Sequence, residues 1–209
     1  MAHCCAGSCG SGRAPDPRYR KVLWMALSIN AVMFLVEALA SVQAHSASLL
    51  ADSMDFLGDA GNYGLSLFVL GMASVWRSRT AYAKGLVMGA FGVLVLTRAL
   101  WTGLGGQAPA AQTMGVIGML ALAANGLVAC LLYAFRDGDA NMRSVWLCTR
   151  NDMIGNLAVL LAALGVFGTG AAWPDIAVAA IMAILGLSSA HEVIQRARQE
   201  LRTTGKPAA

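Results

Sequence analysis

Six apolar stretches constrain the fold of this chain more than any other feature, because each is about as long as a membrane-crossing helix. They cover approximately residues 22–42, 48–75, 83–102, 114–135, 145–168 and 174–194 of the 209. About 20 apolar residues in a helix span a bilayer core, where lipid offers no hydrogen bonds to an unpaired backbone. Charged residues make up 12% of the chain, against roughly 25% in soluble domains. We therefore predict an all-α membrane protein, built as a six-transmembrane-helix bundle.

Basic residues mark alternate ends of these stretches, whereas the connections near His45, Gly105 and Ala171 carry no Lys or Arg. The basic residues concerned are Arg13, Arg18, Arg20, Lys21, Arg77, Arg79, Lys84, Arg136, Arg143, Arg196, Arg198, Arg202 and Lys206. Lys and Arg concentrate in cytoplasmic loops, so we predict a multi-pass protein of the bacterial inner (plasma) membrane with both termini in the cytosol. Because the clusters are short and separated, we expect no nucleic-acid partner.

The first apolar stretch superficially resembles a secretory signal peptide, with Ser41-Val42-Gln43-Ala44 as its cleavage site. It is too long for the apolar core of a signal peptide and contains Glu37, and the alternation of loop charges requires it to be retained. We therefore expect three parts: a cytosolic cysteine-containing tail over residues 1–20, a six-helix transmembrane domain over 21–195, and a short cytosolic tail over 196–209.

Acidic residues inside the apolar stretches are the strongest indication of function. Asp55 and Asp59 lie one helical turn apart in the second stretch, and Cys148 and Asp152 have the same spacing in the fifth. Residues four apart share one helix face, and a carboxylate at membrane depth costs about 2.5–3.5 kcal/mol. Two such faces packed together would offer three carboxylates and a thiol, enough for four-coordination of a divalent cation. The alternatives are acids that hydrogen-bond within the bundle and a cysteine that merely fills space.

Two further buried acids are expected near these residues without binding the metal directly. Asp52 lies three residues before Asp55, and we assign it to a proton pathway or a hydrogen-bond network. Glu37 and Asn30 lie seven residues apart on one face of the first stretch. Hydrogen bonding inside the bundle is the default interpretation for both, with a proton-relay role for Glu37 as the alternative.

The N-terminal tail concentrates metal-binding side chains: His3, Cys4, Cys5 and Cys9. One imidazole and three thiols suit Zn²⁺, Cd²⁺ or Cu⁺ chemically, so this segment is a candidate metal-capture site. Its spacing is not that of a standard zinc finger, and a disordered, reduced tail is the alternative; both interpretations stay open. In the cytosol, structural disulfides are not expected.

The second stretch resembles the signature of the cation diffusion facilitator family at residues 48–59, which read SLLADSMDFLGD. Cys148 and Asp152 occupy the places where that family usually has His-x-x-x-Asp, and Trp173-Pro174-Asp175 at the start of the last stretch also looks like the family. The resemblance covers nearly all of residues 20–200. It implies a metal site made of Asp55, Asp59, Cys148 and Asp152. Many zinc-selective members instead have His at the first and third of these positions.

The resemblance implies proton-coupled efflux of divalent transition-metal cations from the cytosol. We expect Zn²⁺ as the main substrate, Cd²⁺ beside it, and Co²⁺ or Fe²⁺ as further substrates. No enzymatic activity and no resident cofactor are expected. The alternative is a non-transporting membrane metal sensor or metal-binding chaperone.

The expected partners are divalent metal ions, protons, the lipid bilayer and a second copy of the chain. Most family members continue into a cytosolic domain that dimerises, whereas this chain ends soon after the sixth stretch and resembles a variant lacking that domain. A homodimer would therefore form through transmembrane helices. Gly85 and Gly89 are spaced as a small-xxx-small pair, which is typical of close helix packing in membranes, and we predict that this face holds the dimer.

Overall fold

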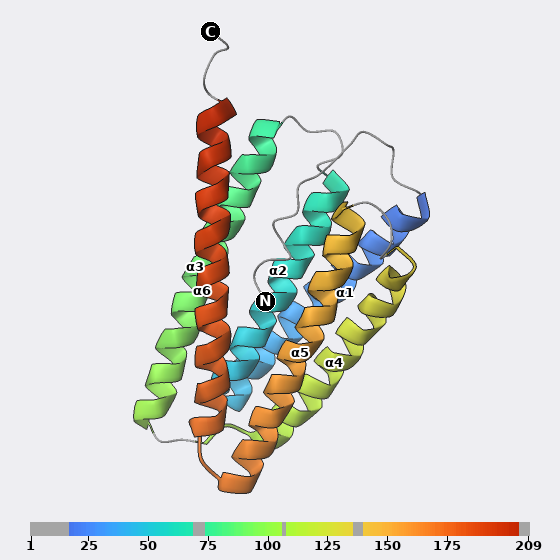
Figure 1. Ribbon diagram of the computed structural model, residues 1–209. Helices are drawn as coiled ribbons and strands as arrows, with labels where there is room; N and C mark the ends of the chain where they lie inside the picture. Colours follow the sequence, from blue (N-terminus) through green and yellow to red (C-terminus); the bar gives the residue numbers. More distant parts are fainter. Residues whose placement is uncertain (1–16, 69–73, 106–107, 136–139, 205–209) are drawn as a thin grey trace.

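The computed structural model describes residues 17–68, 74–105, 108–135 and 140–204, with the backbone alone described at 74–77, 140–148, 150–151 and 203–204. These residues form six helices and no strand (Figure 1). Their bounds are α1 Pro17–Ala44, α2 Ala47–Phe68, α3 Ser74–Gly105, α4 Ala111–Tyr133, α5 Ala140–Thr169 and α6 Trp173–Thr204. The prediction of an all-α protein is confirmed.

Five of the described helices are long and apolar enough to cross a membrane, namely all except α2. The helix α2 has 22 residues, but it carries three acids, Asp52, Asp55 and Asp59. The expected span over residues 48–75 was wrong at its end, because α2 stops at Phe68 and Ser74 already belongs to α3. The apolar run continues across this junction, so hydropathy alone did not reveal the break.

The helices form two groups that share α2. In the first group α1 packs on α2 and α4, and α5 packs on α2 and α4; in the second, α3 and α6 pack along each other. The helix α2 contacts α1, α3, α5 and α6. Figure 1 shows that α1 begins, and α6 ends, at the same end of the bundle, drawn at the top. The acid-bearing helix thus lies at the centre of the fold.

Glycines on α3 bring it close to α6. A Cβ built on Gly85 would lie 2.7 Å from Cγ1 of Ile194, and one on Gly92 would lie 2.8 Å from Cγ of Leu187. Gly89 lies between them and faces Ala190. The Gly85–Gly89 face is therefore a close-packing surface, as predicted, but its partner is α6 of the same chain. Its assignment to a homodimer was wrong, whereas dimerisation through other helix surfaces stays a prediction.

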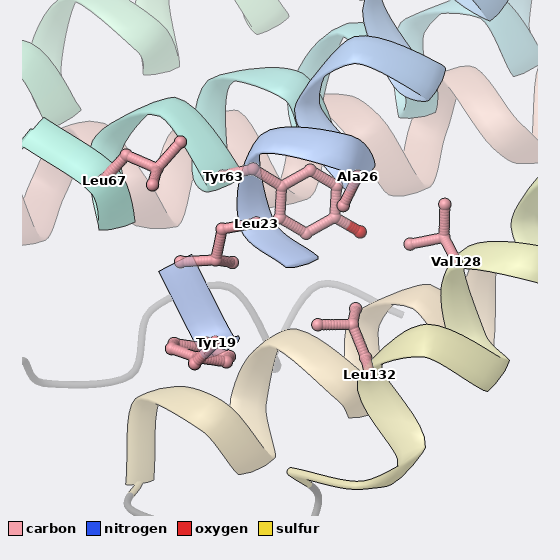
Figure 2. Packing of buried hydrophobic residues seen from close by; sticks show 7 residues of the cluster. All are labelled: Tyr19, Leu23, Ala26, Tyr63, Leu67, Val128 and Leu132. Carbon is pink, nitrogen blue, oxygen red and sulfur yellow. The ribbon is translucent and has the colours of Figure 1, made fainter. Parts of the chain in front are cut away.

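An aromatic and aliphatic cluster fills the end of the bundle at which α1 begins (Figure 2). It joins α1, α2 and α4 through Tyr19, Leu23, Ala26, Tyr63, Leu67, Val128 and Leu132. Many large apolar side chains instead point outward, including Leu39, Trp101 and Phe167. An exposed apolar surface of this kind suits contact with lipid rather than water. Cys130, His45 and His191 are also exposed, as expected for residues outside the predicted metal site.

The opposite end of α2 is held by Asp175 at the start of α6. Its carboxylate accepts hydrogen bonds from the Ala47 and Ser48 backbone N–H groups at 2.8 and 3.1 Å, and from the Ser46 and Ser48 hydroxyls at 2.6 Å each. The first N–H groups of a helix have no partner within the helix, and a carboxylate there also interacts favourably with the helix dipole. Asp175 therefore caps α2 from a different helix.

Candidate metal site

The three acids of α2 differ in their surroundings. Asp52 and Asp59 are buried, whereas the side chain of Asp55 is exposed. Asp55 borders a cavity of about 100 Å³ between α2, α3, α5 and α6, which we call the acid cavity. Its lining comprises Met54, Asp55, Gly58, Asp59, Asn62, Lys84, Met88, Asp152, Gly155, Met182, Leu185, Gly186, Ser189 and Val193. Three of the four predicted metal ligands, Asp55, Asp59 and Asp152, therefore line one space.

Asp59 is held by a chain of hydrogen bonds between α2 and α5. The Tyr63 hydroxyl donates to Oδ2 of Asp59 at 2.9 Å and lies 2.7 Å from Oγ1 of Thr149. The Tyr63 ring belongs to the apolar cluster seen in Figure 2, so its position is set by packing as well as by these bonds. Asp59 and Asp152, from α2 and α5, both line the acid cavity. Sequence reasoning missed Tyr63, although its spacing of four from Asp59 continues the same helix face.

Gly155 of α5 faces the acids of α2. A Cβ built on Gly155 would lie 3.6 Å from Oδ2 of Asp55 and 3.8 Å from Oδ1 of Asp52. A larger side chain there would extend into the space between the carboxylates and the helix. Asp152 lies on the same helix, three residues before Gly155.

Asp55 also borders a second cavity, of about 30 Å³, lined by residues of α2, α3 and α6. Ala51 and Val95 line this second cavity, whereas Asn62 and Lys84 line the acid cavity. A space of this volume can hold a water molecule. Asp55 therefore lies where two small cavities meet along α2.

The predicted quartet is assembled in part. The backbone of α5 places Cys148 one turn before Asp152, but the Cys148 side chain lies outside the described residues. Among the side chains that are described, no three His, Cys, Asp or Glu groups converge as a ready-made metal site. The candidate N-terminal ligands His3, Cys4, Cys5 and Cys9 also lie outside the described part of the chain. Asp55, Asp59 and Asp152 are thus the three predicted ligands that border the same cavity.

Glu37 of α1 and Asp52 of α2 form a second buried acidic pair. Both side chains are fully buried. No described N–H or O–H group donates to the carboxyl oxygens of either residue. Asn30 is also buried, and its side-chain amide donates to the Ala26 carbonyl at 2.8 Å.

Two curated relatives match most of this chain. The "cadmium, cobalt and zinc/H(+)-K(+) antiporter" of Bacillus velezensis is 26% identical over 188 residues, and the protein of the same name from Bacillus subtilis is 24% identical over 188 residues. Each match covers 83% of this chain and 60% of the relative, so the chain spans about three fifths of the length of these relatives. A family model described as the cation efflux transmembrane domain matches residues 23–201. The chain therefore belongs to the cation efflux family, the cation diffusion facilitators.

Proposed function

We propose that this chain moves divalent transition-metal ions out of the cytosol in exchange for protons. The observation that carries the proposal is that Asp55 and Asp59 of α2 and Asp152 of α5 line one cavity. Carboxylates in a membrane bundle are costly unless a cation or protons neutralise them. Membership of the cation efflux family supports the interpretation of this cavity as a cation-transport site.

The four proposed ligands are Asp55, Asp59, Cys148 and Asp152, two from α2 and two from α5. Carboxylate oxygen and thiolate sulfur together suit Zn²⁺, which accepts both, and sulfur adds affinity for the softer Cd²⁺. The relatives' names include cadmium, cobalt and zinc, which supports Zn²⁺, Cd²⁺ and Co²⁺ as substrates, with Fe²⁺ as a further one.

Protons enter the cycle because metal ligands must lose theirs before binding. The carboxyl groups of the acid cavity would carry protons when no metal is bound, and an entering metal ion would displace them. Asp55, at the junction of two cavities, is placed to pass the ion from one to the other. We assign Glu37 and Asp52 to the proton pathway, since both are buried acids without a hydrogen-bond donor among the described residues and neither is a proposed ligand.

We propose that α2 crosses the membrane together with the five other helices, which gives six spans. The protein would lie in the bacterial inner membrane with both termini in the cytosol. Its three acids exclude α2 from the helices that qualify by hydropathy. Its place at the centre of the bundle, in contact with four other helices, buries Asp52 and Asp59 away from lipid. Arg18, Arg79 and Arg198 lie on the parts of α1, α3 and α6 nearest the end that we assign to the cytosol.

The test compares Asp59→Ala and Asp152→Ala with Glu192→Gln, which alters a partly exposed acid paired with Arg196 one turn away on α6. Zn²⁺ binding is measured by calorimetry on purified protein, and flux is measured in proteoliposomes carrying an internal pH indicator. The two ligand variants are expected to lose binding and Zn²⁺-driven proton flux, and the control variant to retain both. Wild-type flux from well-folded Asp59→Ala protein would refute the site. Wild-type binding without any flux would favour the sensor or chaperone function instead.

A further inference from the structure

A lysine side chain extends from α3 toward the proposed metal site. Lys84 lines the acid cavity together with Asp55, Asp59 and Asp152. It also donates a hydrogen bond to the side-chain oxygen of Asn62, three residues further along α2. A positive charge therefore lies on the wall of a cavity proposed to receive a doubly positive ion.

The position of Lys84 is set by how α2 and α3 pack. Its Cδ and Cε atoms each lie 3.8 Å from the place that a Cβ on Gly61 would occupy. The lysine stem thus lies across a position on α2 that has no side chain. Asn62, the next residue, accepts the ammonium hydrogen. The contacts with Gly61 and Asn62 hold Lys84 against α2 on the side that lines the acid cavity.

A divalent ion and this ammonium cannot both occupy the cavity without strong repulsion, because like charges interact strongly away from bulk water. We infer that Lys84 is a tethered competitor for the transported metal. It compensates the charge of the acids when the cavity holds no metal, and it must turn away when the metal enters. A lysine can make this movement, because its flexible stem can carry the charged group toward the aqueous end of the bundle. The inference rests on the proposed function, since it assumes that metal binds in the acid cavity.

Lys84 would thereby lower the affinity of the site for its substrate. A transporter must release its cargo as well as bind it, and a returning ammonium would help to expel the ion. Removing the charge while keeping the bulk should therefore tighten Zn²⁺ binding and slow its release. Lys84→Met makes this change, whereas Lys84→Arg keeps the charge and serves as the matched control.

The first experiment uses the wild-type protein and needs no substitution. The chain has three lysines, Lys21, Lys84 and Lys206. Acetylation of each by a dilute amine-reactive acetylating reagent can be followed by mass spectrometry. Saturating Zn²⁺ is expected to raise the acetylation rate of Lys84 several-fold, because the amine leaves Asn62. The rate at Lys21, which is exposed near the start of α1, should not change. In Asp59→Ala protein the Zn²⁺ effect should disappear.

The second experiment measures Zn²⁺ affinity by competition with a fluorescent chelator. Lys84→Met is expected to bind Zn²⁺ about tenfold more tightly than wild type, whereas Lys84→Arg should stay within about twofold. Zn²⁺ binding with unchanged acetylation of Lys84, or weaker binding by well-folded Lys84→Met, would overturn the inference and leave the proposed function standing. Absence of any Zn²⁺ binding by the wild-type protein would overturn both.

Discussion

Replacing Asp175 should destabilise the bundle more than its position at a helix end would suggest. Asp175→Ala removes the acceptor for two backbone N–H groups, those of Ala47 and Ser48, and for two hydroxyl groups. The hydroxyls of Ser46 and Ser48 already lie 3.4 Å apart and can bond to each other. The two N–H groups are in the buried first turn of α2 and have no such substitute.

The expected loss follows from those two groups. A buried donor left unsatisfied costs about 1–3 kcal/mol, so two cost about 4 kcal/mol at the middle of the range. For a protein of about 200 residues, each kcal/mol lowers Tm by roughly 2–4 °C, which predicts a decrease of roughly 8–16 °C. Asp175→Asn keeps one acceptor oxygen and should lose about half as much.

Thermal unfolding of detergent-solubilised protein, followed by intrinsic fluorescence, measures these decreases. Glu192→Gln is the matched control, because it alters another acid of α6 whose ion pair with Arg196 is partly exposed. Such ion pairs contribute about 0–1 kcal/mol to stability. A Tm for Asp175→Ala within about 2 °C of wild type would contradict the capping argument. The order Ala below Asn below wild type would support it.

Three further substitutions test the packing and the site. Gly85→Ala should lower the free energy of unfolding by about 1–3 kcal/mol, because the added carbon overlaps α6. Gly115 faces open space, so Gly115→Ala should not lower it. Equal Tm values for the two variants would refute the close approach of α3 and α6. Tyr63→Phe should keep the fold but weaken Zn²⁺ binding by about tenfold, since Asp59 loses the hydrogen bond that positions it. An unchanged Kd for Zn²⁺, measured by calorimetry, would contradict this role of Tyr63. Cys148→Ser should weaken Cd²⁺ more than Co²⁺ in competition titrations; equal losses would show that sulfur does not set selectivity.

The helices that cross the bilayer could be predicted from the sequence because lipid imposes a length and a composition on them. Glycine-rich breaks such as 103–106 further marked their ends. The end of α2 was missed because residues 68–75 stay apolar through the connection to α3, so nothing in the hydropathy changes there. The spacing of Gly85 and Gly89 indicated a close-packing face, but spacing cannot tell which helix fills it.

The candidate site shows the same division between local and long-range information. The acids of α2 could be chosen from their spacing and from the cost of charge in a membrane. Contacts between distant residues could not be predicted from one sequence: Tyr63 with Thr149 is 86 residues apart, Lys84 with Asn62 is 22, and Ser46 with Asp175 is 129. The side chain of Cys148 lies outside the described residues, so its role as a ligand stays a prediction.

Asp175 holds the first turn of α2, so this end is the point about which the helix would tilt. At 1.5 Å per residue, Asp59 lies about 18 Å from Ala47 and Phe68 about 31 Å. A tilt of about 10° around the fixed end would therefore displace Asp59 by about 3 Å and Phe68 by about 5 Å. Among the acids of α2, Asp59 would move farthest, whereas Asp52 lies nearer the fixed end and would move less. Because Asp175 belongs to α6, a shift of the paired α3 and α6 would also move the point around which α2 turns.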